Sequence, residues 1–254
     1  MHQAITLATA AAPLPRRSVT GTVRISGRDI DGLILCGEMY GAPSDLLADY
    51  LDVQPDRLRG IVGRWRAAGY AETGRLGPGP AWCWLTRPGL AALGLRFAAG
   101  RPSLGRLAHL RAVLAARLEL ESSPAGQAGQ PWWRSERRIR AAAGSRAGDD
   151  HLPDAEACWA EIPGSRYPGE RWAIEAELTP EPLARTAAIM AGLLYRRTGY
   201  SPGAKPHDRP CYDRAVYLVA PPARSVVTYA AATLPPPLQA RITIRDLPPE
   251  AMPW

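Results

Sequence analysis

The sequence predicts a mixed α/β protein of the α+β class, with a helix-rich first part and a second part built on a mixed sheet. Residues 29–100 carry three helical patterns, followed by two short strand patterns around a Gly-Pro loop. Residues 132–248 instead alternate short apolar runs with helical patterns. The chain has 254 residues, which is enough for two domains that each bury a core.

Composition divides the chain into three regions. Residues 1–27 are expected to be a poorly ordered arm whose arginines can touch a polyanion; these are Arg16, Arg17, Arg24 and Arg28. Residues 28–100 form the first predicted domain and residues 101–254 the second. The net charge of +7 favours a polyanionic partner, and almost all positive charge is arginine, because Lys205 is the only lysine.

Cysteine use and hydropathy limit the class of protein. The four cysteines are far apart and form no metal-ligand spacing, which favours a reducing cytoplasm over a disulfide framework; they are Cys36, Cys83, Cys158 and Cys211. No uninterrupted apolar run approaches the roughly 18 residues of a membrane-spanning helix. We therefore expect a cytoplasmic protein without a membrane partner.

The first domain begins with three predicted helices. The first spans Asp29 to Tyr40, and the second begins after Ser44 as N-cap and ends near Leu51. The third starts near Pro55 and is closed by Gly69. Its apolar face consists of Leu58, Ile61, Val62 and Trp65.

Two strands and a short helix complete this domain, in "YAETGRLGPGPAWCWLT" and "RPGLAALGL". Helix, helix-turn-helix and hairpin in this order are typical of a winged helix-turn-helix, whose third helix enters the DNA major groove. Arginines of the third helix and wing are the predicted DNA contacts: Arg57, Arg59, Arg64, Arg66 and Arg75. A solvated arginine face on an ordinary core helix is the alternative.

The second domain begins with a predicted helix from Leu104 to Glu121 that presents Leu107, Leu110, Leu114 and Leu118 on one side. His109 among these leucines is expected to be a packed or interdomain histidine. "SSPAGQAGQP" is predicted as a loop, and "WWRSERRIR" as a strand or a strand-to-helix segment.

The remaining elements are strands at "HLPDAEACWA", "RWAIEAEL", "DRAVYLVA" and "ARITIRDL", with helices at "TPEPLARTAAIMAGLLYRRTG" and "ARSVVTYAAATL". Thr179 is the expected N-cap of the first of these helices, and Leu183 is expected to face inward. The short link between the first two strands predicts an antiparallel hairpin, and the intervening helices predict parallel pairing later.

The hairpin gathers carboxylates on one sheet face, because alternate residues of a strand point the same way. The predicted register sets Asp154 opposite Glu177 and Glu156 opposite Glu175. Such a cluster needs protonation, arginine partners or a divalent cation. Two or three carboxylates suit Mg²⁺ or Mn²⁺, which can activate water against a phosphodiester.

"PD" at Pro153–Asp154 and "EAE" at Glu175–Glu177 resemble the core of the PD-(D/E)XK nuclease superfamily. The resemblance implies metal-binding roles for Asp154 and Glu175 with Mg²⁺ or Mn²⁺. It also implies an earlier catalytic acid, for which Glu136 is favoured over Glu121. Glu177 stands where the superfamily has a lysine that positions or activates the attacking water. Lys205 could replace it only if its loop folded over the site.

The chain as a whole resembles the actinobacterial replication-relaxation family over roughly residues 29–248. The similar stretches are "YGAPSDLLADYLDV", "AAGYAETGR", "WLTRPGLAALGL", "LAHL", "HLPDAEA" and "AIEAELTPEPLART". The resemblance implies a winged helix-turn-helix followed by a nuclease-like domain, in a protein linked to plasmid replication and DNA relaxation.

Three functions are consistent with the sequence. The favoured one is a DNA-binding accessory protein of plasmid replication or mobilisation (conjugation), with a nuclease-like second domain that has either kept or lost its catalytic activity. The alternatives are a metal-dependent DNA endonuclease or nickase, and a winged-helix transcriptional regulator. The expected partners are double-stranded DNA, a relaxase or replication protein, and a second copy of the chain.

Overall fold

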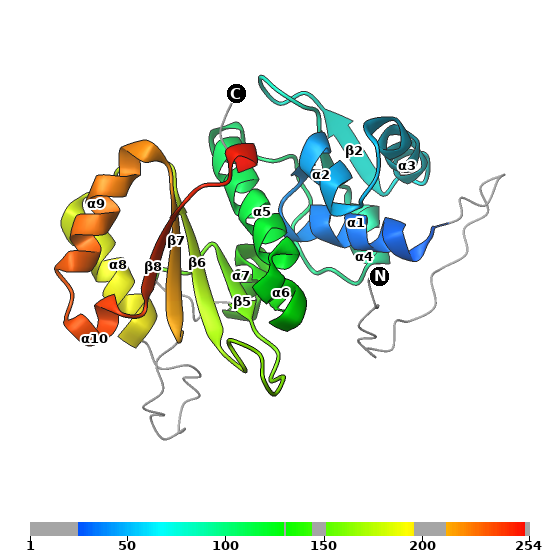
Figure 1. The fold of residues 1–254 in the computed structure, drawn as a ribbon. Helices are drawn as coiled ribbons and strands as arrows, with labels where there is room; N and C mark the ends of the chain where they lie inside the picture. Colours follow the sequence, from blue (N-terminus) through cyan, green and yellow to red (C-terminus); the bar gives the residue numbers. More distant parts are fainter. Residues whose placement is uncertain (1–24, 130, 144–150, 196–211, 252–254) are drawn as a thin grey trace.

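The protein has an α+β fold with two sheets, as the sequence predicts (Figure 1). The computed structural model describes residues 25–129, 131–143, 151–195 and 212–251. Arg16, Arg17 and Arg24 of the predicted arm, together with Cys211 and Lys205, lie outside these residues. Within them, no helix is both long and apolar enough to cross a lipid bilayer.

The first part contains four helices and a three-stranded antiparallel sheet of order β1-β3-β2 among its described residues. The elements are α1 (Gly27–Glu38), β1 (Ala42–Pro43), α2 (Ser44–Tyr50), α3 (Pro55–Ala67), β2 (Ala71–Gly74), β3 (Trp82–Leu85) and α4 (Arg87–Ala92). Their order confirms the predicted helices and hairpin. Two details of the prediction were wrong. Pro43 rather than Ser44 is the N-cap of α2, and the two-residue strand β1 was not expected.

The apolar face of α3 determines how this part packs. Leu58, Ile61 and Trp65 are buried, and Trp65 has no exposed surface. Val62, which was predicted on the same face, is half-buried. Gly69 follows the helix with φ +73°, a backbone conformation that glycine adopts without strain. The observed helix therefore ends at the glycine that the sequence indicates.

A connecting region follows, formed by η1 (Leu104–Arg106), α5 (Leu107–Ser122) and α6 (Pro124–Gly129). Figure 1 shows α5 between the first part and the five-stranded sheet. Seven consecutive residues of α5, 110–116, are buried, so the helix is enclosed on more than the one leucine side that was predicted. The short helix α6 corrects the prediction of a loop.

The second part is a five-stranded sheet of order β4-β5-β6-β7-β8. Its elements are β4 (Trp132–Ser135), α7 (Glu136–Ala143), β5 (Ala155–Cys158), β6 (Arg171–Glu177), α8 (Leu183–Tyr195), β7 (Arg214–Val219), α9 (Pro221–Ala232), α10 (Pro236–Gln239), β8 (Ile242–Asp246) and η3 (Pro249–Ala251). Strands β4, β5 and β6 pair antiparallel, whereas β6, β7 and β8 pair parallel. Both predicted modes of pairing are confirmed.

The two sheet faces are covered by different helices (Figure 1). Ile174 and Ala176 belong to the same buried cluster as residues 112–116 of α5. On the opposite face, Met190 and Leu194 of α8 pack with Tyr217 of β7. Helix α8 begins at Leu183 rather than at Pro180, and the Leu183 side chain is exposed, so its predicted inward position was wrong.

The first and second parts are held together by one continuous core and by ion pairs. A single buried cluster runs from residues of α1 and α3 through α5 to β6. Arg111 of α5 donates two hydrogen bonds to Asp45 of α2, at 2.9 and 2.6 Å. Arg138 of α7 donates to Glu38 at the end of α1. The segment between residues 95 and 103, where the predicted domain boundary falls, contains no helix or strand.

Candidate functional site

The hairpin of β5 and β6 brings the predicted acids Asp154 and Glu175 together. The observed register pairs Ala155 with Ile174 and Glu156 with Ala173, so the predicted register was wrong by two residues. A shift of two residues keeps each side chain on its original face. Asp154 lies just before β5, and its Oδ2 accepts a hydrogen bond from the backbone N–H of Ala176 at 2.9 Å.

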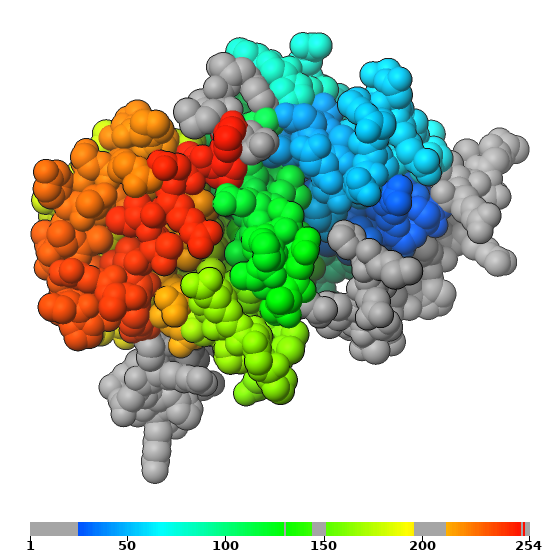
Figure 2. Space-filling model, viewed as in Figure 1, coloured from blue at the N-terminus to red at the C-terminus, as the bar shows by residue number. Residues whose placement is uncertain are grey.

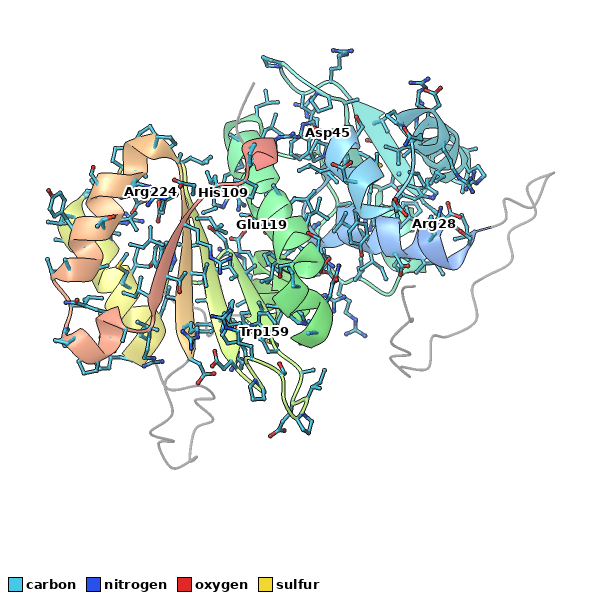
Figure 3. The ribbon with its side chains drawn as sticks, in the orientation of Figure 1. Arg28, Asp45, His109, Glu119, Trp159 and Arg224 are labelled. Carbon is cyan, nitrogen blue, oxygen red and sulfur yellow. The ribbon has the colours of Figure 1, made fainter. Side chains whose placement is uncertain are left out.

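His109 is the second partner of Asp154. It projects from α5 toward the sheet, and its Nε2 lies 2.8 Å from Asp154 Oδ1 (Figure 3). Burial opposes a charge on this ring, but the hydrogen bond and the negative charge of Asp154 outweigh that effect and raise the pKa of His109. The pair therefore favours an imidazolium beside a carboxylate. Of the two predicted alternatives, a packed or an interdomain histidine, this contact with Asp154 fits the packed one, because both residues belong to the predicted second domain.

Glu175 and His151 form a different kind of pair. His151 Nε2 lies 2.7 Å from Glu175 Oε1, and the Glu175 residue is 3% exposed. Burial, reinforced by the charges of Asp154 and Glu177, raises the pKa of Glu175 well above its ordinary value. Burial also lowers the pKa of His151. Both shifts favour the neutral form of each partner.

Two more polar groups border Glu175 on the same face. Burial and the charges of Glu181 and Asp154 raise the pKa of Glu177. Tyr217 lies opposite Glu175 on β7, and its fully buried hydroxyl has no hydrogen-bond partner among the described residues. Burial, followed by the charge on Glu175, raises the pKa of Tyr217 well above its ordinary value. The electrostatics of this region thus disfavour additional negative charge.

Glu156 is separate from this cluster. It pairs with Ala173 rather than with Glu175, and it is 2% exposed. Its carboxylate lies 3.1 Å from Arg134 Nη1 and 3.2 Å from Arg171 Nη2, and it accepts a 2.7 Å hydrogen bond from the Tyr212 hydroxyl. The two guanidinium groups compensate the charge of Glu156, and the hydroxyl donates a hydrogen bond to it, so Glu156 has a structural role.

Glu136, the predicted earlier acid, lies beside Asp154 at the start of α7. Its backbone N–H donates to the carbonyl of Asp154 at 3.0 Å. Its side chain is held by Arg106 and Arg140, each at 2.7 Å. Burial opposes ionisation of Glu136, but these two guanidinium groups lower its pKa. Glu136 and Asp154 also border a cavity of about 10 Å³, which has room for about one water.

These side chains do not fit a divalent metal. Within the described ranges, no group of three or more His, Cys, Asp or Glu side chains has an arrangement that could hold a metal ion. Asp154 is engaged by His109 and a backbone N–H, and Glu175 favours its protonated form beside His151. Protonated carboxyl groups are poor ligands for Mg²⁺ or Mn²⁺, because these ions bind anionic oxygen. The structure thus brings the predicted pair together, but each carboxyl group is already engaged by a histidine.

The predicted DNA-contacting arginines fall into two groups. Arg64 lies 3.0 Å from the buried carboxylate of Asp29, which also accepts from Trp65 Nε1 at 2.7 Å. Arg64 therefore anchors α1 to α3. The Arg64 side chain is still 46% exposed, and the other four predicted arginines are exposed as well: Arg57, Arg59, Arg66 and Arg75. Of these, Arg59 pairs at 2.5 Å with Asp56, and both side chains extend into solvent.

The exposed face of α3 has arginines along its edges and glycine at its centre. Arg57 and Arg64 are seven residues apart, as are Arg59 and Arg66, so each pair lies along one edge of the helix. Gly60 and Gly63 lie between these edges. A Cβ at either glycine would meet nothing within 4 Å. The centre of this face leaves the helix backbone open to a partner.

Comparisons with known proteins give little further information. No protein-family model and no curated protein matches the chain. Among solved structures, the crystal structure of RV1404 from Mycobacterium tuberculosis is similar to 52% of this chain, which corresponds to 80% of that chain. The identity is 19% and the TM-score is 0.26. A likeness at this level does not define a common fold.

Proposed function

We propose that this chain is a DNA-binding accessory protein of the replication-relaxation type, in which residues 28–100 act as a winged helix-turn-helix on double-stranded DNA. The observation that carries the proposal is the solvent-facing side of α3. Three arginines with exposed side chains flank an open glycine strip, and a further arginine lies after β2; they are Arg57, Arg59, Arg66 and Arg75. Cationic side chains can contact phosphates while the glycines allow the helix backbone to approach a groove closely.

The second part is proposed to act as a nuclease-like scaffold that contacts DNA or a replication or mobilisation protein without cutting. Its carboxylates are compensated by histidines, arginines and protonation. Glu177 also stands where the resembled superfamily has a lysine, and the pKa of Glu177 is raised. A carboxyl group there cannot supply the positive charge that stabilises a phosphodiester transition state.

DNA binding is tested by the salt dependence of association. Each phosphate contact contributes about 0.9 to the slope of log Kobs against log salt concentration. Replacing Arg57, Arg59 and Arg66 together by glutamine should reduce the slope by about 2.7, measured by fluorescence anisotropy on a labelled duplex. A matched variant replaces three exposed arginines elsewhere, Arg96, Arg166 and Arg245, and should keep most of the slope. Equal slopes for the two variants would remove α3 from the interface.

The absence of cutting is tested separately. Supercoiled plasmid incubated with the protein and Mg²⁺ or Mn²⁺ should stay intact. Nicking that Asp154→Ala abolishes would instead establish the endonuclease alternative and contradict the proposed scaffold role. DNA binding is measured in parallel without metal, so the two parts of the proposal can fail independently.

A further inference from the structure

A groove at the junction of the two parts has the opposite charge to the arginine face of α3. It has a volume of about 1230 Å³ and is bordered by the start of α1, the end of α2, the second half of α5 and the segment after β8. In Figure 2 these elements adjoin where the blue N-terminal helices meet the green α5 and the red C-terminal segment. Figure 3 labels Arg28 and Glu119, which lie on α1 and α5 respectively.

The groove combines apolar side chains with excess negative charge. Leu118 and Leu247 contribute apolar surface. Six carboxylates and one guanidinium group, that of Arg28, complete its charged lining; the acids are Asp31, Asp49, Asp52, Glu119, Glu121 and Asp246. A chain of net charge +7 therefore has one concave surface that attracts cations.

Several of these carboxylates have no counter-charge within the described ranges. Glu121 is paired with Arg117 at 2.8 Å, and Asp246 with Arg224 at 2.5 Å. In contrast, Asp31, Asp52 and Glu119 form no ion pair with a described residue. Partial desolvation raises the pKa of Asp31, although the residue as a whole is exposed. A cationic segment with apolar residues would complement the lining.

We propose that the groove binds the chain's own N-terminal segment, residues 1–24. This segment contains Arg16, Arg17 and Arg24 and no Asp or Glu. Leu14 and Val19 flank the adjacent Arg16 and Arg17, so positive charge and apolar side chains lie close together, as the mixed lining of the groove requires. The segment thus supplies the positive charge that the groove lacks and apolar side chains that can pack against its leucines.

Chain connectivity favours this occupant over a separate partner. The segment joins the described chain at Ile25, three residues before Arg28 at the edge of the groove. Residues 14–19 are 6 to 11 residues from Ile25, which corresponds to about 20–36 Å of extended chain, so they can lie over the groove whose edge includes Arg28. A short tether also gives an effective concentration in the millimolar range, which exceeds that of a free partner of the same chemistry.

The test uses the full-length chain with a photo-crosslinking amino acid at position 14. After irradiation at low salt, mass spectrometry should place the crosslinks in residues 28–31, 46–52, 115–127 or 246–249 of the same chain, which border the groove. The crosslinked product should migrate as a monomer. Crosslinks to other regions, or only between two chains, would overturn the proposal.

Charge variants test whether the groove itself is responsible. Asp52→Lys with Glu119→Lys should reduce the crosslink yield severalfold, whereas Glu161→Lys, at an exposed acid of the β5–β6 loop, should leave it unchanged. Adding Arg16→Glu and Arg17→Glu to the groove variant should restore the yield, because both partners then have reversed charge. Equal yields in the groove and control variants, or no rescue by the reversed segment, would contradict charge-directed docking.

Discussion

Replacing Asp29 by alanine should lower the free energy of unfolding by about 2.5 kcal/mol, mainly by leaving a buried indole N–H without an acceptor. Asp29 is 2% exposed and accepts hydrogen bonds from Trp65 Nε1 at 2.7 Å and Arg64 Nη2 at 3.0 Å. It also accepts from the backbone N–H of Ser26 at 2.9 Å, which completes the capping box of α1. One carboxylate therefore connects the start of α1 with the core side of α3.

The magnitude follows from what each donor can do after the substitution. Trp65 has no exposed surface, so its unsatisfied N–H should cost about 2 kcal/mol. Arg64 and Ser26 can be rehydrated, and losing each of these contacts should cost about 0.5 kcal/mol. The higher helix propensity of alanine returns about 0.5 kcal/mol. Because burial opposes ionisation of Asp29 while Ser26, Trp65 and Arg64 lower its pKa, its contribution is present at neutral pH and is lost on acidification.

Urea unfolding at pH 7, followed by tryptophan fluorescence, measures this loss. Asp31→Ala is the matched control, because Asp31 lies two residues later in α1, is exposed and forms no ion pair; its effect should stay within about 0.5 kcal/mol. In the Asp29→Ala background, Trp65→Phe should cost about 2 kcal/mol less than in the wild type, because it then removes an indole N–H that Asp29→Ala has left unsatisfied. Equal losses for Asp29→Ala and Asp31→Ala would refute the reasoning.

Two further predictions concern the carboxylate face. The folded-state pKa of Glu175 is raised, so the wild type should lose stability as the pH rises through that value. Glu175→Gln should avoid this loss, and urea unfolding at pH 5 and pH 8 should show a stability difference that grows with pH; a constant difference would count against the protonated carboxyl. Tyr217→Phe removes a buried hydroxyl without a partner among the described residues, so it should raise the free energy of unfolding by up to about 1 kcal/mol. A loss above about 1 kcal/mol in the same assay would mean that this hydroxyl is satisfied in solution.

The sequence predicts local structure well where the spacing of apolar residues and a helix-terminating residue indicate the same element. The apolar spacing of Leu58, Ile61 and Trp65 identified α3, and Gly69 identified its end. The length of each connection likewise predicted which strands of the second sheet pair antiparallel and which pair parallel. The short helix α6 was missed because its sequence, "PAGQAG", has no apolar period and is stabilised by its surroundings. Gly126 there lies so close to the Leu120 carbonyl that a Cβ would approach it to 1.9 Å.

The candidate site was only partly predictable, because its partners come from distant segments. The motif located Asp154 and Glu175, and the period of the strands placed them on one face. His109 is 45 residues from Asp154, and only the packing of α5 against the sheet brings them within 2.8 Å. The ion pair of Arg64 could not be predicted from the sequence either, because its partner Asp29 belongs to another helix. Composition identifies a charge, but tertiary packing determines whether that charge is free for a ligand.

The gathering of four carboxylates on one face of a basic protein has a local explanation. The free-energy cost of burying each acid is offset in a different way. Asp154 contacts a histidine whose pKa is raised, Glu175 favours its protonated form, and Glu156 is paired with two arginines. Glu177, whose pKa is raised, is the fourth acid on this face. A lysine at 177 alone would not create a metal site, because Asp154 and Glu175 would keep their histidine partners. Metal binding at this face would require both carboxylates to be free of their histidine partners.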